Sequence, residues 1–121
     1  MKVLKVLPRL VVDDLDTAVR AFEAVIGDTA TRFSSGDLNL AKIGDLVLAQ
    51  PPDSKPNLKQ IQVVFVVDDV EEVASLLAAQ NIEIVEPLGA TGIGRRIVAR
   101  GSATALVEYT ELNAQTAALL G

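Results

Sequence analysis

Two residues of opposite charge, Arg9 and Glu108, each interrupt a mostly apolar run of the kind that forms β-strands. A guanidinium and a carboxylate can join through two parallel hydrogen bonds, and a buried carboxylate without a partner is costly. One interpretation is that Arg9 and Glu108 pair inside a cleft, where Glu108 could also serve as a catalytic base. The other is that both lie at strand ends in water, as most charged residues do.

Side chains on a strand alternate between its two faces, so the neighbours of these residues can be sorted. Those expected to pack against helices are Leu10, Val12, Phe65 and Val67. Those expected to face the cleft and bind a ligand are Arg9, Val11, Gln62, Val64, Val66, Leu106 and Glu108, together with Leu7 and Thr110. For Gln62 a second interpretation stays open, because it follows Lys59 and Gln60 and could begin its strand in water.

The 121-residue chain contains no histidine and no cysteine. The lack of histidine removes the commonest general base and the commonest metal ligand. The lack of cysteine removes disulfides, thiolate metal sites and cysteine nucleophiles. Ser-His-Asp and Cys-His catalysis are therefore excluded.

The segment from Gly89 to Arg96 contains three glycines and ends in two arginines. Backbone amides beside guanidinium groups can form a lid that binds an anion. The segment lacks the Lys-Ser or Lys-Thr ending of a P-loop and opens no helix, so it does not indicate a nucleotide site. The alternative is a flexible connection between two strands.

Two pairs of adjacent aspartates, Asp13-Asp14 and Asp68-Asp69, resemble a paired-carboxylate site. Each pair also stands directly before a segment with helical periodicity. Because aspartate is a favoured helix N-cap, we interpret both pairs as capping residues.

These aspartates belong to a repeat. Leu-Val-Val-Asp-Asp-Leu at 10–15 recurs as Phe-Val-Val-Asp-Asp-Val at 65–70. An amphipathic helix is expected after each copy, ending at Gly27 in the first and near Asn81 in the second. Three strands should then follow in each half. The expected strands are 29–34, 38–43 and 46–50 in the first half and 83–87, 95–100 and 105–110 in the second. A last helical stretch is expected at 114–120.

The predicted fold is therefore a single α+β domain, residues 1–121, built from two tandem βαβββ modules whose mixed sheets curl around a cleft. The modules cover about 1–51 and 58–113, and a polar, proline-rich linker covers 52–57.

This pattern resembles the vicinal oxygen chelate superfamily, which includes glyoxalase I, bleomycin-resistance proteins and ring-cleaving dioxygenases. The glycine-started segment 101–109, with an apolar-Glu-apolar ending at Leu106–Tyr109, is similar to the strand that closes many members. The usual Asp-Pro-Asp-Gly turn is absent, and Ala21-Phe22-Glu23 replaces the Phe-Tyr that many members carry in the first helix.

The resemblance also implies where metal ligands would lie. The positions are Leu7 and Gln62 on the first strand of each module, Leu48 or Ala49 on the last strand of the first module, and Glu108 on that of the second. Of these, Gln62 and Glu108 alone carry a side chain that can coordinate a metal. A catalytic site needs about three protein ligands, so we expect no metal and no cofactor.

Three functions follow from these expectations. The leading one is metal-independent binding of a small molecule, as in bleomycin-resistance proteins. The alternative is a lyase or isomerase of the glyoxalase I type that uses Glu108 as a base or as a metal ligand. A further alternative is a protein-interaction module whose cleft is filled by its own side chains.

Charge and hydropathy limit the partners. The net charge is −5 and no basic cluster is present, so nucleic acid is not expected. No apolar run approaches the roughly 20 residues of a membrane span, which indicates a cytoplasmic protein without a membrane partner. Open sheet edges and the family resemblance predict a homodimer.

Overall fold

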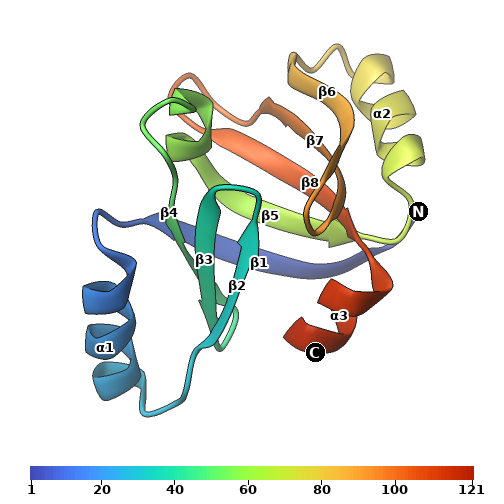
Figure 1. The fold of residues 1–121 in the computed structure, drawn as a ribbon. Coiled ribbons are helices and arrows are strands. Elements are labelled where there is room, and N and C mark those ends of the chain that lie inside the picture. The colour runs from blue at the N-terminus through green and yellow to red at the C-terminus, as the bar shows by residue number, and fades with distance from the viewer.

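The computed structural model describes residues 1–121 as two successive βαβββ units followed by a short helix (Figure 1). The first unit contains β1 (Val3–Val11), α1 (Leu15–Ile26), β2 (Thr31–Ser35), β3 (Leu38–Ile43) and β4 (Leu46–Gln50). The second contains β5 (Ile61–Val67), α2 (Val70–Ala79), β6 (Ile84–Thr91), β7 (Gly94–Arg100) and β8 (Leu106–Leu112), and α3 (Ala114–Leu120) ends the chain. The predicted element order is confirmed.

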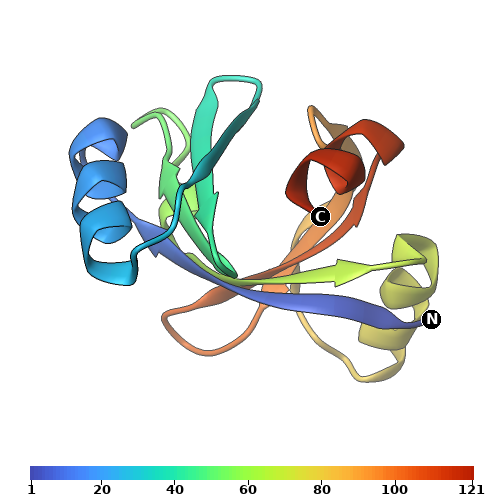
Figure 2. The ribbon, with the colours of Figure 1, turned by 90° about the horizontal axis from the view of Figure 1, so that it is seen from below.

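All strands join one eight-stranded mixed sheet in the order β2-β3-β4-β1-β5-β8-β7-β6. β1 runs parallel to β4 and β5 parallel to β8, while β1 and β5 pair antiparallel at the centre. The two units therefore join through the β1–β5 ladder, in which the first strand of each unit pairs with that of the other. The sheet curls into an arch with β1 and β5 at its base (Figure 2), which confirms the predicted fold class.

The second aspartate of each pair acts as a helix cap. The Asp14 carboxylate accepts a hydrogen bond from the Thr17 amide at 3.2 Å, and Asp69 accepts one from the Glu72 amide at 3.2 Å. α1 is followed by Gly27 at φ 78°, a left-handed conformation that glycine adopts without strain. The capping interpretation is confirmed for Asp14 and Asp69, whereas Asp68 accepts a hydrogen bond from the Lys2 amide.

Both long helices cover the convex face of the sheet (Figure 2). α1 packs Leu15 and Val19 over β3 and β4, where it buries Ala41 and Leu48. The helix therefore leaves β1 uncovered, and Leu10, which we expected to pack against it, is 42% exposed. The expectation holds for Val67, which is buried among residues of α2.

The concave face holds the largest hydrophobic cluster, with residues from both units. Leu7 of β1, Leu40 of β3 and Val66 of β5 meet there. Leu58, from the 3₁₀ helix Pro56–Lys59, also belongs to it. The segment between the units therefore contributes to the core. No helix of the structure has the length and hydrophobicity needed to cross a bilayer.

Candidate functional site

A small pocket lies on the concave face, between the curled sheet, its two outer hairpins and α3. Its cavity volume is about 40 Å³, and its walls are mostly apolar. The main apolar lining residues are Leu7, Phe33, Leu40, Val64, Val66 and Leu112. The polar lining residues are Arg9, Ser35, Thr91, Arg96, Glu108 and Thr110.

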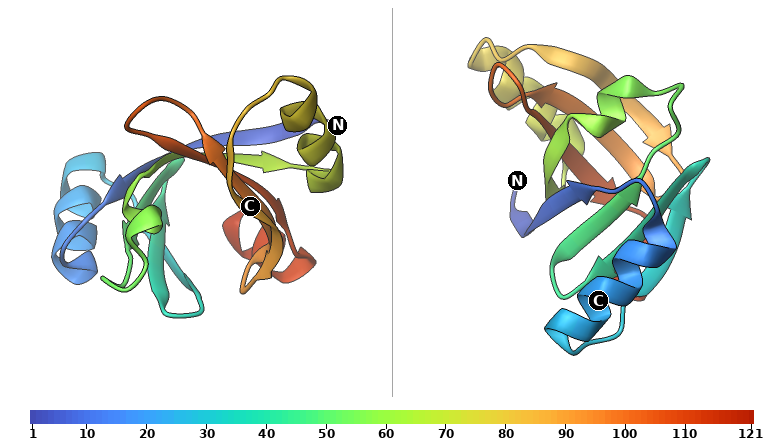
Figure 3. Two further views of the ribbon diagram at one scale, coloured as in Figure 1. Left: turned by 90° about the horizontal axis from the view of Figure 1, so that it is seen from above. Right: turned by 90° about the vertical axis from the view of Figure 1, so that its left-hand side faces the viewer.

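The tips of the two outer hairpins meet beside the pocket (Figure 3, right). The amide of Gly92, between β6 and β7, donates a hydrogen bond to the Ser35 hydroxyl at the end of β2, at 3.1 Å. A side-chain carbon on Gly92 would lie 3.0 Å from the Ser35 Cα, so glycine permits this approach. The segment expected to be a lid or a flexible connection is thus the turn of a β-hairpin.

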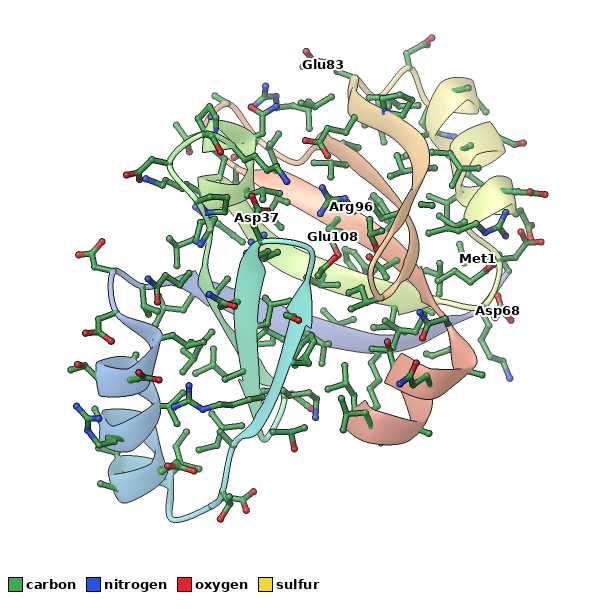
Figure 4. The ribbon with its side chains drawn as sticks, in the orientation of Figure 1. Met1, Asp37, Asp68, Glu83, Arg96 and Glu108 are labelled. Atoms are coloured by element: carbon green, nitrogen blue, oxygen red, sulfur yellow. The ribbon has the colours of Figure 1, made fainter.

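Glu108 is 6% exposed and is held by two donors. Arg96 Nη1 lies 3.3 Å from its carboxylate, and the Thr110 hydroxyl donates to it at 2.5 Å. Arg96 Nη2 binds Glu86 at 2.9 Å. Figure 4 shows Arg96 and Glu108 next to each other near the middle of the molecule.

The expected Arg9–Glu108 ion pair is not formed, because β5 separates the strands that carry these residues. Two strands apart corresponds to about 10 Å across a sheet. On the neighbouring strand β7, Arg96 lies opposite Thr110, diagonal to Glu108 and on the same face. Diagonal neighbours are within reach of long side chains, so Arg96 takes the place we expected for Arg9.

Arg9 is 7% exposed, and its Nη1 and Nη2 atoms are buried without any hydrogen-bond partner. Burial lowers the pKa of Arg9 from its ordinary value, and the nearby Arg96 lowers it further, while the charge of Glu108 opposes the change. The pocket therefore contains two guanidinium groups and one carboxylate.

The structure brings six of the nine residues expected to face the cleft to the pocket and leaves three outside it. The six that line the pocket are Leu7, Arg9, Val64, Val66, Glu108 and Thr110. Leu106 is fully buried in the cluster beneath it. Val11, the last residue of β1, lies in a surface hollow beside Pro51 and Pro52.

Gln62 is exposed, because the β5–β8 register shifts between Ile61 and Val63 and breaks the alternation. Its neighbour Ile61 is buried in its stead. The interpretation of Gln62 as a residue in water agrees with this placement.

Arg96 is the main site residue that the sequence reasoning missed. It falls within the expected strand 95–100, but it was considered only as part of the glycine-rich segment, together with Arg95. Both arginines lie on β7, and alternation separates them: Arg96 faces the pocket, whereas Arg95 binds Glu111 at 2.8 Å and Glu71 at 2.9 Å. Alternation along the expected strand 95–100 places Arg96 on the same face as Val98.

The donor set does not fit a divalent metal. Of the four implied ligand positions, Leu7 is apolar, Gln62 lies outside the pocket, and Leu48 packs against α1. Glu108 is the one carboxylate at the pocket, and two guanidinium groups lie around it. No group of three or more Asp or Glu side chains converges anywhere in the structure. A cation would meet repulsion here with too few ligands.

Comparison with known proteins now places this fold. Residues 4–109 match the family model of the Glyoxalase/Bleomycin resistance protein/Dioxygenase superfamily. The chain belongs to this superfamily. The resemblance inferred from the repeat and the closing strand is confirmed, and the superfamily is the one that contains the vicinal oxygen chelate proteins.

Solved structures of the superfamily fold agree. An uncharacterized protein from Methanosarcina mazei is 27% identical, with a TM-score of 0.80 over 93% of this chain and 95% of that one. Methylmalonyl-CoA epimerase from Mycobacterium tuberculosis is 19% identical, with a TM-score of 0.73 over 96% and 93% of the two chains. A Streptomyces coelicolor methylmalonyl-CoA epimerase variant in complex with 2-nitronate-propionyl-CoA is 16% identical, with a TM-score of 0.72 over 93% and 97%. No functionally curated protein matches the sequence significantly.

Proposed function

We propose that this superfamily member binds a small molecule in the concave pocket without the help of a metal. The observation that carries the proposal is the pocket itself, a partly open and mostly apolar space with a few convergent polar groups. Such a combination is typical of small-molecule sites. The polar groups at its floor are cations and one neutralised carboxylate, which supports binding without a metal.

A metabolite panel screened by thermal shift and by ligand-detected NMR, in the presence of EDTA, tests this proposal. We expect at least one ligand whose binding survives EDTA and is lost in Val64→Phe, which fills the pocket. Val25→Phe, on the exposed face of α1, is the matched control and should keep binding. Binding that requires added Zn²⁺, Mn²⁺ or Ni²⁺ would contradict the metal-independent assignment.

An isomerase or lyase of the glyoxalase type is the alternative, and Glu108 is the observation that favours it. Its carboxylate is buried at the pocket, where it could take a proton from a carbon next to a carbonyl group. The likeness to the two epimerases is a likeness of fold and adds nothing to this argument. Ligands found in the panel can be incubated in deuterated water, and exchange that disappears in Glu108→Gln would favour the enzyme.

The interaction module with a filled cleft is favoured by the small volume of the cavity and by the size of the hydrophobic cluster around it. It is distinguished by the same panel, because a filled cleft would give no ligand in any class.

We also propose that two copies of the chain associate through the uncovered outer face of β1. Val6 and Leu10 lie on this face and are 52% and 42% exposed, since α1 and α2 cover other strands. Contiguous exposed apolar side chains of this kind mark interaction surfaces. A twofold axis would place this face against its own copy.

A further inference from the structure

We propose that the ligand of the pocket is a small monocarboxylate with a short apolar chain, and that Arg9 binds its carboxylate through both terminal nitrogens. The proposal rests on the proposed small-molecule function and assigns its ligand class.

The first argument is that the charge of Arg9 has no use within the folded chain. Its Nη1 and Nη2 atoms are inaccessible to water and have no hydrogen-bond partner. Buried polar groups are nearly always satisfied, and a buried unpaired charge is among the costliest features in a protein. Arg9 lies on β1, a central strand of the sheet, opposite Val47 of β4, where an apolar residue would serve the core better. An energetic cost of this kind at the wall of a pocket indicates that Arg9 has a binding role.

The second argument is that the neighbouring acids are already engaged. Glu108 accepts from Arg96 Nη1 and from Thr110, and Glu86 accepts from Arg96 Nη2. The unbalanced positive charge of the pocket therefore belongs to Arg9. The partner that restores the balance must be an anion supplied from outside.

The third argument distinguishes a carboxylate from other anions. The two terminal nitrogens of a guanidinium match the two oxygens of a carboxylate in one plane. The cavity of about 40 Å³ has room for about three water-sized groups, which suits a carboxylate with one to a few carbons. Leu7, Leu40 and Val66 surround this space and offer contacts to an alkyl chain. The other donors at the pocket, from Arg96, Thr91 and Thr110, already bind acceptors within the chain and are not free for a phosphate or sulfate dianion.

Calorimetric titration of the whole chain tests the assignment. The probes are the straight-chain acids from formate to hexanoate, the matching neutral amides, and inorganic phosphate. We expect one carboxylate to bind per chain, with an optimum at a short chain length. The amide of the same length should bind at least tenfold more weakly, because it cannot replace the missing negative charge.

Three arginine variants separate binding from folding. Arg9→Met should lose at least tenfold in affinity while the ligand-free protein melts at the same or a higher temperature, since an uncompensated charge has been removed. Arg9→Lys keeps the positive charge but cannot form two parallel hydrogen bonds, so its affinity for the carboxylate should lie between those of the wild type and Arg9→Met. Arg20→Met, on the exposed side of α1, is the control and should bind as the wild type does.

The outcomes that overturn the assignment differ from those that overturn the proposed function. Phosphate binding as tight as the best carboxylate, or equal carboxylate binding by wild type and Arg9→Met, would overturn it. So would a fall in ligand-free melting temperature in Arg9→Met, because Arg9 would then be a structural residue. A neutral metabolite bound in the pocket would refute the carboxylate class and leave small-molecule binding intact. The absence of any ligand would refute both.

Discussion

At Glu108 the protein keeps a buried carboxylate by surrounding it with donors from two strands. Arg96 reaches it from β7 and Thr110 from its own strand, both on the concave face. Charge-assisted hydrogen bonds of this type are stronger than neutral ones. The charge of Glu108 is therefore balanced inside the folded chain, whereas that of Arg9 is not.

Removal of Arg96 should be costly because it leaves Glu108 buried with one hydroxyl donor. We expect Arg96→Met to lower the free energy of unfolding by on the order of 3 kcal/mol. Arg95→Met is the matched control, since Arg95 makes its ion pairs on the exposed outer face and its loss should change stability little. Urea melts give both values.

The same melts decide which arginine is coupled to Glu108. A double-mutant cycle of Arg96→Met with Glu108→Gln should show non-additivity above about 0.5 kcal/mol. The cycle of Arg9→Met with Glu108→Gln should show a smaller coupling, because β5 lies between the two residues. The reverse ranking would mean that the Arg96–Glu108 pair does not form in solution.

At the scale of the element, the helices are fixed by signals local to the chain. Asp14 accepts from the Thr17 amide at the start of α1, and Asp69 does the same for α2. These bonds satisfy amides that have no partner within the helix. The repeat that contains them predicts the order of elements correctly for this reason.

The cap at Asp14 should show in the pH dependence of stability. Hydrogen bonds from Thr17 lower the pKa of Asp14 from its ordinary value of 3.8. A carboxyl whose pKa is lower in the folded state stabilises the fold above the unfolded pKa, and this contribution is lost as the pH falls through the folded value. We expect Asp14→Ala to melt a few degrees below the wild type from pH 5 to 8.

The difference in melting temperature should shrink below about pH 4, where Asp14 becomes protonated in both states. Asp13→Ala removes the adjacent exposed carboxylate, which caps nothing, and serves as the control. A melting-temperature deficit in Asp14→Ala that persists undiminished at pH 3 would show that the carboxylate charge is not responsible.

The site was predicted less completely than the fold, because it depends on relations between strands. Alternation alone identified Arg9, Val64, Val66 and Glu108 as pocket residues. It failed at Gln62, where a register shift reverses the face, and no local signal marks that shift. The partner of Glu108 depends on the pairing of β7 with β8, which the residues of either strand do not specify alone.

At the scale of the whole molecule, the arch leaves the outer face of β1 uncovered between α1 and α2 (Figure 2). Val6 and Leu10 of β1 are exposed there. An apolar face at the centre of a sheet, flanked by helices on both sides, is a position where a second arch can pack.

We expect the chain to sediment as a dimer at micromolar concentration and Val6→Glu to sediment as a monomer, because a charge at the centre of an apolar interface is left without water or a partner. Val25→Glu, at the most exposed apolar residue of α1, adds the same charge away from this face and should remain dimeric. A monomeric wild type would refute the proposed dimer, and a dimeric Val6→Glu would place the interface elsewhere.

The pocket draws its polar groups from both units: Arg9 comes from the first, and Arg96 and Glu108 come from the second. In a separated first half, Arg9 would be hydrated, so its desolvation belongs to the step in which β1 joins β5. Occupation of the pocket and assembly of the two halves are therefore thermodynamically linked. A carboxylate that binds Arg9 would therefore stabilise the association of the two halves. Two fragments produced by cleavage within residues 51–55 should bind each other more tightly when this carboxylate is present.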